Sequence, residues 1–542
     1  MPTIVSYKWT LINNLKISDN QLEELLFKLK SEVKPIDADH VEIEVNNDRP
    51  DLFFPYGIIR AAKGILGKEL GEPKYDIKQS VYSFEVKEVK SRPYAVAGIV
   101  KDIKLDDESL RELIQFQEKL HITVGRKRKK VAIGIHDLDK ITSTKIYYKP
   151  LPLDYKFIPL NQSKLMTIKE VIEQTPQGRE YGNISIYDGL SPAIVEENGD
   201  VLSIPPIINS DKTRIDEKTR NIFIDVTGTS FEAVSSTLDI LVTDLAEMGG
   251  KIELLNFISP SKFEFSPLLR RYTVSVSANY ISKNLGINLS LNEIEKYLRM
   301  ARFDTKVLND VVEVTVPPYR VDILSQIDLV EEIAMTIGYD KLSPKDYTIK
   351  ATGKLSAETE LIRTLRDLSI GAGFSEIFTF ILSNDKRLRN EYVSIVNPVT
   401  VEYNAVRNSL IPTLLNFLKY NQHAIMPVYV FEIGDVVIKD KRTDTGYKNS
   451  LRAVYGIMNS KVNYEDLQSR VHQILMSLDI EPTYKTYLDD MFIPGRGAKI
   501  IDTSKSVEIG VIGEINPVLL EELEIEFPVV ISEIYLDSLV KR

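Results

Sequence analysis

Residues 219–229 read TRNIFIDVTGT, an apolar run that ends in small polar residues. The run predicts a buried strand over Asn221–Val226, with Asp225 and Thr227 near its end. Residues 201–210, VLSIPPIINS, form a second apolar run that carries small polar groups. Together the two stretches predict a pocket whose hydroxyls and carboxylate could hold a water or a substrate hydroxyl, with no Ser–His–Asp arrangement legible. The structural alternative is a Thr-Gly turn in which Asp225 caps a loop.

The segments around this pocket predict a mixed α/β region from Arg92 to about Phe257. Period-two alternation indicates strands at Tyr94–Val100 and Val131–Ile135, and apolar residues at helical spacing indicate an amphipathic helix over Asp107–Leu120. The first part of the chain predicts helices over Gln21–Ser31 and Tyr56–Leu66 with a strand at Val41–Val45 between them. The polar segment Gly71–Gln79, which contains Pro73, is interpreted as a linker.

Two further regions follow the pocket region along the chain. The first predicts a compact, winged-helix-like unit with strands at Tyr272–Val276 and Val312–Val316 and helices at Ala278–Leu285, Leu291–Arg299 and about Gln326–Ile337. From Thr348 onward the pattern predicts an antiparallel sheet flanked by helices. Its helices are Ala357–Ala372 and Tyr464–Leu478, and its strands include Ser375–Phe380, Val428–Ile433, Ala453–Met458 and Glu508–Ile512.

Length and composition predict an α+β protein of several domains. The chain has 542 residues, 43% hydrophobic and 27% charged, and no cysteine. At roughly 100 to 200 residues per domain, three to five domains are expected. The missing cysteines exclude disulfides, a thiolate nucleophile and cysteine-ligated metals. With no signal peptide pattern and no run of roughly 20 apolar residues, we expect a cytoplasmic protein without a membrane partner.

Three carboxylates share one face of the helix predicted at about Gln326–Ile337. Asp328, Glu331 and Glu332 stand at i, i+3 and i+4, shortly after Asp322. Like charges at this spacing repel each other, so a cation or a basic surface should lie opposite them. Oxygen ligands without His or Cys suit Mg²⁺. The alternative is that these acidic residues complement the dipole at the start of the helix.

A basic run interrupts this acidic chain. The net charge of −10 argues against nucleic-acid binding over the whole surface, so any RNA contact must be local. Residues 126–130, RKRKK, form a local positive patch suited to phosphate contacts, or alternatively a solvated turn. His121 and His136 flank the run and are interpreted as structural or surface residues.

Several ordered stretches carry a resemblance over essentially the whole chain: residues 47–51, 117–121, 131–140, 205–210, 219–229, 316–342 and 431–437. In these stretches the sequence resembles the β subunit of archaeal and eukaryotic cytosolic phenylalanyl-tRNA synthetase. The resemblance implies domains at residues 1–85 (N-terminal α/β), 86–262 (editing), 266–345 (winged-helix-like) and 346–542 (class II synthetase-like). The implied enzyme joins phenylalanine to tRNA(Phe) with ATP.

The resemblance implies that the editing domain hydrolyses tyrosine wrongly esterified to tRNA(Phe). Such a site is needed because an apolar activating pocket rejects one added hydroxyl by only about 10²-fold. Ester cleavage requires an oriented water and stabilisation of the developing oxyanion. The expected site residues are Ser203, Asn209, Ser210, Asp225 and Thr227. Two alternatives stay open: a scaffold subunit with a decayed editing pocket, and a free-standing deacylase.

The resemblance also implies a metal and a partner. Family members bind Mg²⁺ close to the α subunit through acidic residues that match Asp322, Asp328, Glu331 and Glu332. The region from about residue 348 lacks the Arg-x-Glu and Gly-x-Gly-x-x-x-Glu-Arg patterns that hold ATP, and neither Arg407-Asn-Ser nor Gly495-Arg-Gly replaces them. Activation is therefore expected of an α subunit, in an (αβ)₂ heterotetramer that binds tRNA(Phe).

Overall fold

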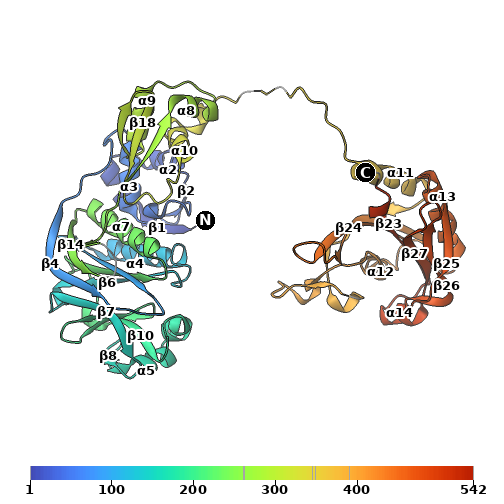
Figure 1. Ribbon diagram of the computed structural model, residues 1–542, viewed down its shortest axis with the longest axis horizontal. Coiled ribbons are helices and arrows are strands. Elements are labelled where there is room, and N and C mark those ends of the chain that lie inside the picture. The colour runs from blue at the N-terminus through green and yellow to red at the C-terminus, as the bar shows by residue number, and fades with distance from the viewer. Residues whose placement is uncertain (1, 260–262, 345, 348, 390, 541–542) are drawn as a thin grey trace. The chain divides into compact units, whose positions relative to one another are not determined.

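The computed structural model describes residues 2–259, 263–344, 346–347, 349–389 and 391–540. The chain forms two compact units, Met1–Asp346 and Tyr347–Arg542 (Figure 1). Both contain helices and sheets, so the prediction of a mixed α+β chain with several domains is confirmed. The expected boundaries at residues 262 and 345 lie outside the described residues.

The first unit begins with a three-stranded sheet in the order β1-β3-β2, covered by helices. The elements are β1 (Thr3–Tyr7), α1 (Lys8–Leu15), α2 (Asp19–Phe27), β2 (Glu32–Pro35), β3 (His40–Glu44) and α3 (Pro55–Ile65). Ser18 and Gln21 form a capping box at the start of α2. This helix ends earlier than its apolar spacing predicts, because the chain turns at Lys30, which has a φ of 55°.

A ten-stranded sheet forms the middle of this unit, in the order β12-β11-β10-β7-β4-β14-β5-β13-β6, with β15 paired to β14. The pairs β14–β4 and β4–β7 are parallel, and the other pairs are antiparallel. The strands are β4 (Ile77–Val86), β5 (Tyr94–Lys101), β6 (Val131–Asp137), β7 (Lys145–Pro152), β10 (Leu190–Glu196), β11 (Val201–Ile204), β12 (Ile208–Asn209), β13 (Ile222–Gly228), β14 (Lys251–Ile258) and β15 (Phe265–Ser266).

The linker interpretation of Gly71–Gln79 is wrong in its last part, because Ile77–Gln79 begin strand β4. Strand β4 lies inside the sheet between β7 and β14, and the expected domain boundary at residues 85/86 falls at its end. The polarity that suggests a linker reflects exposed positions along the first part of the strand, where Ile77, Lys78 and Gln79 all face solvent. Non-local pairing rather than local pattern therefore determines this strand.

Helices α4 (Asp107–Ile122) and α7 (Phe231–Glu247) pack on the ten-stranded sheet, and α5 (Ile168–Gln174), α6 (Pro176–Tyr181), β8 (Lys156–Phe157) and β9 (Met166–Thr167) lie near its β10 side (Figure 1). Leu238, Leu241 and Leu245 of α7 are fully buried at helical spacing. Each such side chain contributes roughly 1.5 to 3 kcal/mol by its burial. This core continues into the first sheet and its helices, so the two sheets share one hydrophobic interior.

The last part of the first unit is a three-stranded sheet, β16-β18-β17, packed against three helices. The elements are β16 (Tyr272–Ser277), α8 (Ala278–Leu285), α9 (Leu291–Met300), β17 (Asp304–Leu308), β18 (Val311–Val316) and α10 (Gln326–Ile337). The hydroxyls of Ser277 and Ser290 cap α8 and α9, which explains why these helices begin where the sequence predicts.

The second unit is built on a seven-stranded sheet, β19-β23-β24-β28-β27-β26-β25, beside a small sheet, β20-β22-β21. The strands are β19 (Ser375–Glu376), β20 (Leu382–Ser383), β21 (Val393–Ser394), β22 (Ala405–Val406), β23 (Val428–Lys439), β24 (Tyr447–Met458), β25 (Pro482–Thr486), β26 (Phe492–Asp502), β27 (Val507–Ile515) and β28 (Val529–Tyr535). The helices are α11 (Ala357–Gly371), α12 (Ile411–Tyr420), α13 (Tyr464–Ser477) and α14 (Pro517–Glu522).

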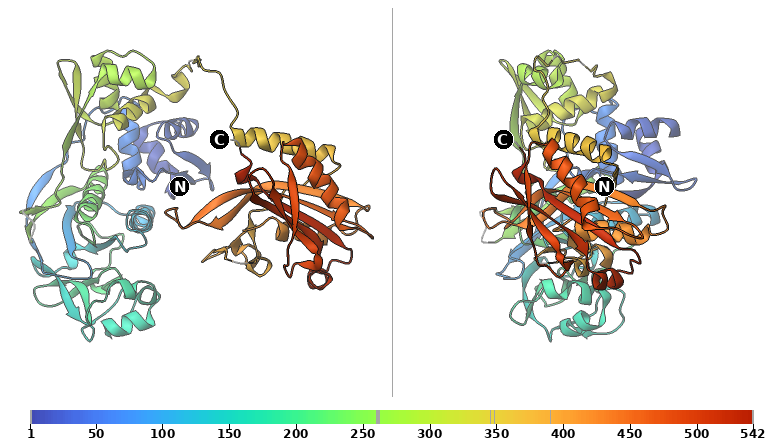
Figure 2. Two further views of the ribbon diagram at one scale, coloured as in Figure 1. Left: turned by 45° about the vertical axis from the view of Figure 1, so that its right-hand side comes forward. Right: turned by 90° about the vertical axis from the view of Figure 1, so that its right-hand side faces the viewer.

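Helices cover both faces of the seven-stranded sheet (Figure 2). Tyr455 of β24 packs in one hydrophobic cluster with residues of α11 and α13, whereas its neighbour Val454 packs in another with residues of α12 and α14. Successive side chains of a strand point to opposite faces, so the two helix pairs lie on opposite sides. The strand predicted at Ser375–Phe380 is shorter than expected, because Thr379 donates its backbone N–H to the Glu432 side chain.

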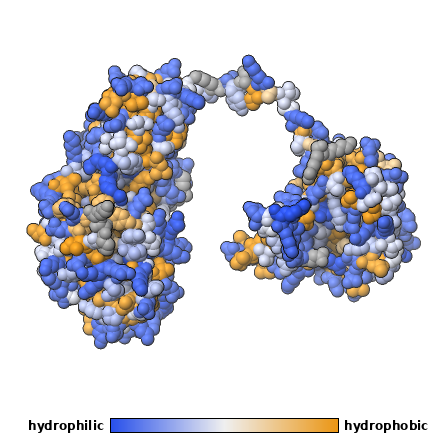
Figure 3. All heavy atoms as spheres, viewed as in Figure 1, coloured by the Kyte–Doolittle hydropathy of each residue, from blue (hydrophilic) through white to orange (hydrophobic). Residues whose placement is uncertain are grey.

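Hydrophilic residues dominate the face of the molecule in Figure 3, with smaller apolar areas between them. Within the described part of the chain, no helix combines the length and apolar composition that crossing a membrane requires.

Candidate functional site

A cavity of about 540 Å³ lies against the ten-stranded sheet, lined by residues of α4, β6, β11, β12 and β13. This volume is in the range of small-molecule sites. Ile114, Ile133 and Ile204 supply part of an apolar wall. The polar lining residues are Gln117, Glu118, His121, Arg128, Asn161, Gln162, Thr175, Gln177, Ser203, Asn209, Thr213, Arg214 and Asp225. The pocket predicted from residues 201–229 therefore exists.

The position of Asp225 in the cavity depends on the strand next to it. Strand β13 pairs with β5 on one side and with β6 on the other, and the β6 pairing places Asp225 opposite Gly134. A Cβ atom added at Gly134 would lie 2.1 Å from Oδ2 of Asp225. Only glycine at this position leaves room for the carboxylate.

Asp225 is buried and held by two neighbours. Its Oδ2 atom lies 2.9 Å from Nε2 of His136 and accepts a hydrogen bond from the Ser203 hydroxyl at 3.3 Å. An ionised carboxylate only accepts hydrogen bonds, so Nε2 of His136 carries the proton. The Nδ1 atom of His136 lies 2.8 Å from the Thr213 hydroxyl. Ser203 contacts the carboxylate instead of the imidazole, so the group is not a Ser–His–Asp triad.

The structure brings three of the five expected site residues, Ser203, Asn209 and Asp225, to the cavity lining. Asn209 donates from Nδ2 to the carbonyl oxygen of Ile135. The other two stand behind the lining. The Ser210 hydroxyl donates to the Ile158 carbonyl and accepts from the Lys212 backbone, and Thr227 is buried beside Arg92, which donates to its hydroxyl and its carbonyl oxygen.

The cavity lining also includes Glu118, His121 and Arg128. Nε2 of His121 accepts from the Ile133 N–H at 2.8 Å, so the proton sits on Nδ1, which lies 3.0 Å from Glu118. Burial lowers the pKa of His121, which keeps the ring neutral at pH 7. Burial alone would raise the pKa of Glu118, but His121 and the Arg128 guanidinium hold that pKa at about 2. Glu118 is thus a fixed anion.

The sequence treats His121 and His136 as isolated residues, whereas the structure shows that His121 lines the cavity and His136 contacts Asp225. One signal for His136 is present in the sequence. It stands two residues after Gly134 in a strand, so the two share a face. Finding its partner, however, requires the register between β6 and β13, which no local pattern contains.

The acidic residues expected to hold Mg²⁺ have protein partners instead. Arg320 binds Asp322 through Nε and Nη2 at 2.9 and 2.7 Å, and its Nη2 also lies 2.6 Å from Glu332. Asp328 accepts two backbone N–H groups at the start of α10, and Glu331 forms an ion pair with Lys30 at 2.7 Å. The basic surface predicted opposite these carboxylates is therefore present.

This donor set does not fit a metal site built from all four carboxylates. In the described ranges, no three Asp, Glu, His or Cys side chains converge so as to hold a metal ion. Asp322 and Glu332 share a single guanidinium, that of Arg320, which lies 2.7 and 2.6 Å from their oxygens.

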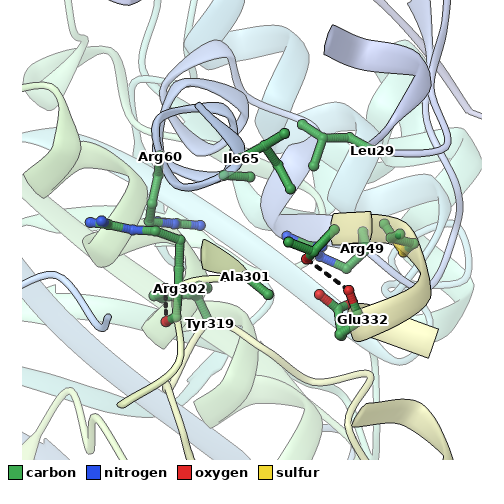
Figure 4. Close-up of a pocket in the computed structure, with 11 residues that line it drawn as sticks. Leu29, Arg49, Arg60, Ile65, Ala301, Arg302, Tyr319 and Glu332 are labelled. Atoms are coloured by element: carbon green, nitrogen blue, oxygen red, sulfur yellow. Dashed lines mark hydrogen bonds between the residues drawn. The ribbon is translucent and has the colours of Figure 1, made fainter. Parts of the chain in front are cut away.

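Further buried charges connect this region to the rest of the first unit. Arg60 lies 2.7 Å from Asp244 and 3.1 Å from Asp51, and its guanidinium stacks on the Tyr319 ring at 3.6 Å. The Asp244 contact is close but lacks hydrogen-bond geometry. Arg60, Tyr319 and Glu332 line a small pocket of about 10 Å³, room for about one water (Figure 4).

Three family models match the chain. They are the B3/4 domain over residues 87–241, the tRNA synthetase B5 domain over residues 274–339, and the phenylalanyl tRNA synthetase beta chain CLM domain over residues 345–536. All lining residues of the cavity of about 540 Å³ lie within the first match, residues 87–241.

Curated relatives match over the full length. The chain is 60% identical over 539 residues to the phenylalanine–tRNA ligase beta subunit of Sulfurisphaera tokodaii, covering 99% of both chains. It is 54% identical to that of Saccharolobus solfataricus, covering 100% of this chain and 99% of the relative. Among solved structures, it is 36% identical, with a TM-score of 0.60, to an N-terminal fragment of the phenylalanyl-tRNA synthetase beta subunit from Pyrococcus horikoshii, covering 62% of this chain and all of the fragment.

Proposed function

Because this chain belongs to the family of phenylalanine–tRNA ligase beta subunits, components of an aminoacyl-tRNA synthetase, we propose that its cavity hydrolyses tyrosine wrongly esterified to tRNA(Phe). The observation that carries the proposal is the buried Asp225 carboxylate, which faces a cavity of about 540 Å³ and is held by His136 and Ser203.

Asp225 gives the cavity a means to select tyrosine over phenylalanine. Its Oδ2 atom is engaged by His136 and Ser203, whereas Oδ1 makes no hydrogen bond to the described residues and can accept one from a phenol hydroxyl. Phenylalanine would leave this buried carboxylate oxygen without a partner. A site built to hydrogen-bond a hydroxyl rejects the analogue that lacks it by about 10⁴- to 10⁵-fold.

We propose that a water attacks the ester carbonyl directly. The bond to the ribose oxygen breaks, that oxygen takes one proton of the water, the other proton is released to solvent, and tyrosine leaves with a free carboxylate. The Ser203 hydroxyl donates to the Asp225 carboxylate and is not paired with a histidine, so we assign the attack to a water rather than to this hydroxyl. Ser203, Asn209 and Asp225 contact the substrate and the water in this proposal. Ser210 and Thr227 shape the cavity from behind, Ser210 through the loop that follows β12 and Thr227 through Arg92.

Replacing Asp225 tests this function. In the complex with the α subunit, we expect Asp225→Asn to lower the hydrolysis of tyrosyl-tRNA(Phe) at least about tenfold and to reduce the preference over phenylalanyl-tRNA(Phe). Asp200→Asn is the control, because Asp200 is partly exposed and bound to Lys212 away from the lining. A wild-type complex that never clears tyrosine would overturn the proposal and favour a scaffold subunit.

We also propose the division into residues 1–85, 86–262, 266–345 and 346–542, with the second as editing domain, the third winged-helix-like and the fourth a degenerate class II synthetase fold. The matches over residues 87–241, 274–339 and 345–536 support it. Adenylate formation by the isolated chain would contradict the last assignment.

The proposed partners are the α subunit, in an (αβ)₂ heterotetramer in the cytoplasm, and tRNA(Phe). In the second unit, Phe378 and Phe380 are 90% and 73% exposed beside a cavity also lined by Tyr403 and Tyr420. Such an aromatic patch is typical of a protein interface. Gel filtration of the two chains expressed together tests the assembly.

The family resemblance implies Mg²⁺ at Asp322, Asp328, Glu331 and Glu332, but the arrangement of these side chains does not fit that ion. Asp322 and Glu332 bind Arg320, Glu331 binds Lys30, and Asp328 caps α10. These contacts support an ion-pair role for the four carboxylates.

A further inference from the structure

The basic run at residues 126–130 forms the turn between α4 and β6, the helix and strand that line two walls of the cavity. Arg128 itself lines the cavity. Its guanidinium points inward, where it binds Glu118 at 2.7 Å and donates to the carbonyl oxygens of Pro206 and Ile207 at 3.2 Å. The turn is therefore anchored to the rim of the cavity by its middle residue.

The turn has a fixed and unusual backbone. Arg126, Lys127 and Arg128 adopt φ angles of 49°, 54° and 62°, three successive left-handed residues that side chains with a Cβ atom rarely form. Backbone hydrogen bonds close the turn, including one from Lys130 to Gly125 at 2.8 Å. Conformations of this kind persist only when surrounding contacts impose them, and they cluster at functional sites.

Buried Arg92 supplies one of these contacts. Its Nη1 atom donates to the carbonyl oxygens of Arg128 and Lys129 at 3.0 and 3.4 Å, and its Nη2 atom donates to the Thr227 carbonyl oxygen at 2.7 Å. Thr227 follows Asp225 by two residues in β13. One side chain thus ties the basic turn to the strand that carries the carboxylate of the site.

Three of the other four cations of the turn face solvent. Arg126, Lys127 and Lys129 are exposed, and none of them lies within 4 Å of a carboxylate among the residues described. In a chain with a net charge of −10, this leaves a concentrated positive patch at the cavity rim without internal neutralisation.

We propose that Arg126, Lys127 and Lys129 bind the backbone phosphates next to the 3′ end of the aminoacylated RNA whose ester occupies the cavity. This inference rests on the proposed function. The terminal ribose and its amino acid must enter the cavity while the preceding phosphates stay outside, at the rim. Exposed Lys and Arg side chains neutralise phosphates by releasing counterions, and a fixed turn holds them without further ordering.

The contribution of the turn is to binding rather than to chemistry. The three side chains lie outside the cavity, so their removal should raise KM for hydrolysis of the mischarged RNA and leave kcat unchanged. Each phosphate contact adds about 0.7 to 0.9 to the slope of log affinity against log salt. Losing two contacts therefore lowers that slope by about 1.5.

The experiment compares Lys127→Gln/Lys129→Gln with Lys104→Gln/Lys218→Gln in the full chain bound to its α subunit. Both doubles remove two exposed cations and give the same net charge. Lys104 follows β5 and Lys218 precedes β13, so both lie near the end of the sheet where Ile222 pairs with Val100. The basic turn lies at the other end of these strands, because it leads into β6 at Val131, which pairs with Gly228. The probe is an acceptor-stem RNA that carries tyrosine on its 3′ ribose through a non-hydrolysable amide.

We expect the slope of log affinity against log salt to be smaller by about 1.5 for the turn variant than for the wild type. Between about 50 and 200 mM salt, the turn variant should therefore lose about tenfold less affinity than the wild type does. The control variant should keep the wild-type slope. Equal slopes for the two variants would overturn the proposal, as would loss of α-subunit binding in the turn variant alone, which would make the patch a protein interface. If the wild type does not hydrolyse the ester yet binds the probe through the turn, the proposed function fails and the phosphate site stands.

Discussion

At the scale of single residues, the candidate site depends on Gly134, which has no side chain. Gly134 leaves the space that the Asp225 carboxylate fills, with 2.1 Å between Oδ2 and the Cβ that any other residue would add. This contact involves the part of Asp225 that His136 and Ser203 hold in place. The orientation of the carboxylate is therefore set from the neighbouring strand.

We predict that Gly134→Ala lowers hydrolysis of tyrosyl-tRNA(Phe) at least about tenfold, because the methyl group displaces the carboxylate from His136. Deacylation assays and thermal unfolding of the same preparation measure the two effects separately. Gly371→Ala is the control, since nothing lies within 4 Å of the Cβ it would add. Wild-type activity in Gly134→Ala would mean that Asp225 is not held as described.

The sequence predicts some site residues and misses others for a physical reason. Asp225 lies near the end of one apolar run and Ser203 lies inside another, so each stands out as a polar residue in a local pattern. Glu118 and Arg128 meet across ten residues and a left-handed turn, and His136 meets Asp225 across two strands. Such pairs depend on strand register and turn geometry, so no local spacing predicts them.

At the scale of elements, α4 is tied to the first strand by a buried acid. The Glu112 carboxylate accepts from the Ser6 hydroxyl and the Tyr7 N–H, both at 2.9 Å. Burial raises the pKa of Glu112 to about 7, more than these two hydrogen bonds lower it. Asp239 in α7 is also buried, which raises its pKa to about 7.

We predict that the free energy of unfolding falls as pH rises from about 5 to about 7 and levels off above that pH. A carboxyl whose folded pKa lies above its unfolded value stabilises the protein fully below the unfolded pKa, and this stability is lost as pH rises through the folded pKa. Glu112→Gln keeps the acceptor oxygen and should reduce the decline by up to about 1 kcal/mol per pH unit. Denaturant titrations from pH 5 to 8 measure it, with exposed Glu23→Gln as control; an unchanged slope in Glu112→Gln would contradict the prediction.

The ion pairs of Arg320 with Asp322 and with Glu332 of α10 stabilise the first unit. Arg320 is buried between Asp322 and Glu332, so Arg320→Met should destabilise the first unit by about 3 to 5 kcal/mol through unpaired buried charges. Since the partner is a guanidinium, the loss should be present in EDTA and in magnesium alike. Denaturant unfolding in both conditions tests this. Magnesium that restores full stability to the variant would show that the carboxylates readily accept a metal.

Helices α4, α9 and α10 are predicted from local signals, whereas α7 and α12 are not identified from the sequence. Helix α10 begins after Ser325, whose capping box with Asp328 fixes its start, and Gly338 follows its end. The strand order of the ten-stranded sheet is not predictable from local signals, because strands far apart in the sequence, such as β4 and β14, pair with each other. Their contact is set by the shared core rather than by either segment alone.

At the scale of the whole molecule, each of the two units has a hydrophobic interior of its own. We predict that Phe378→Asp/Phe380→Asp prevents co-purification with the α subunit without lowering the unfolding temperature, because both rings are exposed in the free chain. Val518→Asp/Leu488→Asp, also at exposed apolar positions of the second unit, is the control. Full recovery of the complex with the first variant would place the α-subunit interface elsewhere.

Strand β4 limits how this protein can be dissected. It lies in the ten-stranded sheet between β7 and β14. The strand ends at Val86, however, just before the segment that the B3/4 domain model matches, residues 87–241. A fragment cut at residue 87 would separate the sheet into two halves with unpaired edges, prone to association. The ten-stranded sheet is therefore complete only in a fragment that begins before Ile77, so the segment matched from residue 87 cannot fold as the intact sheet without the chain that precedes it.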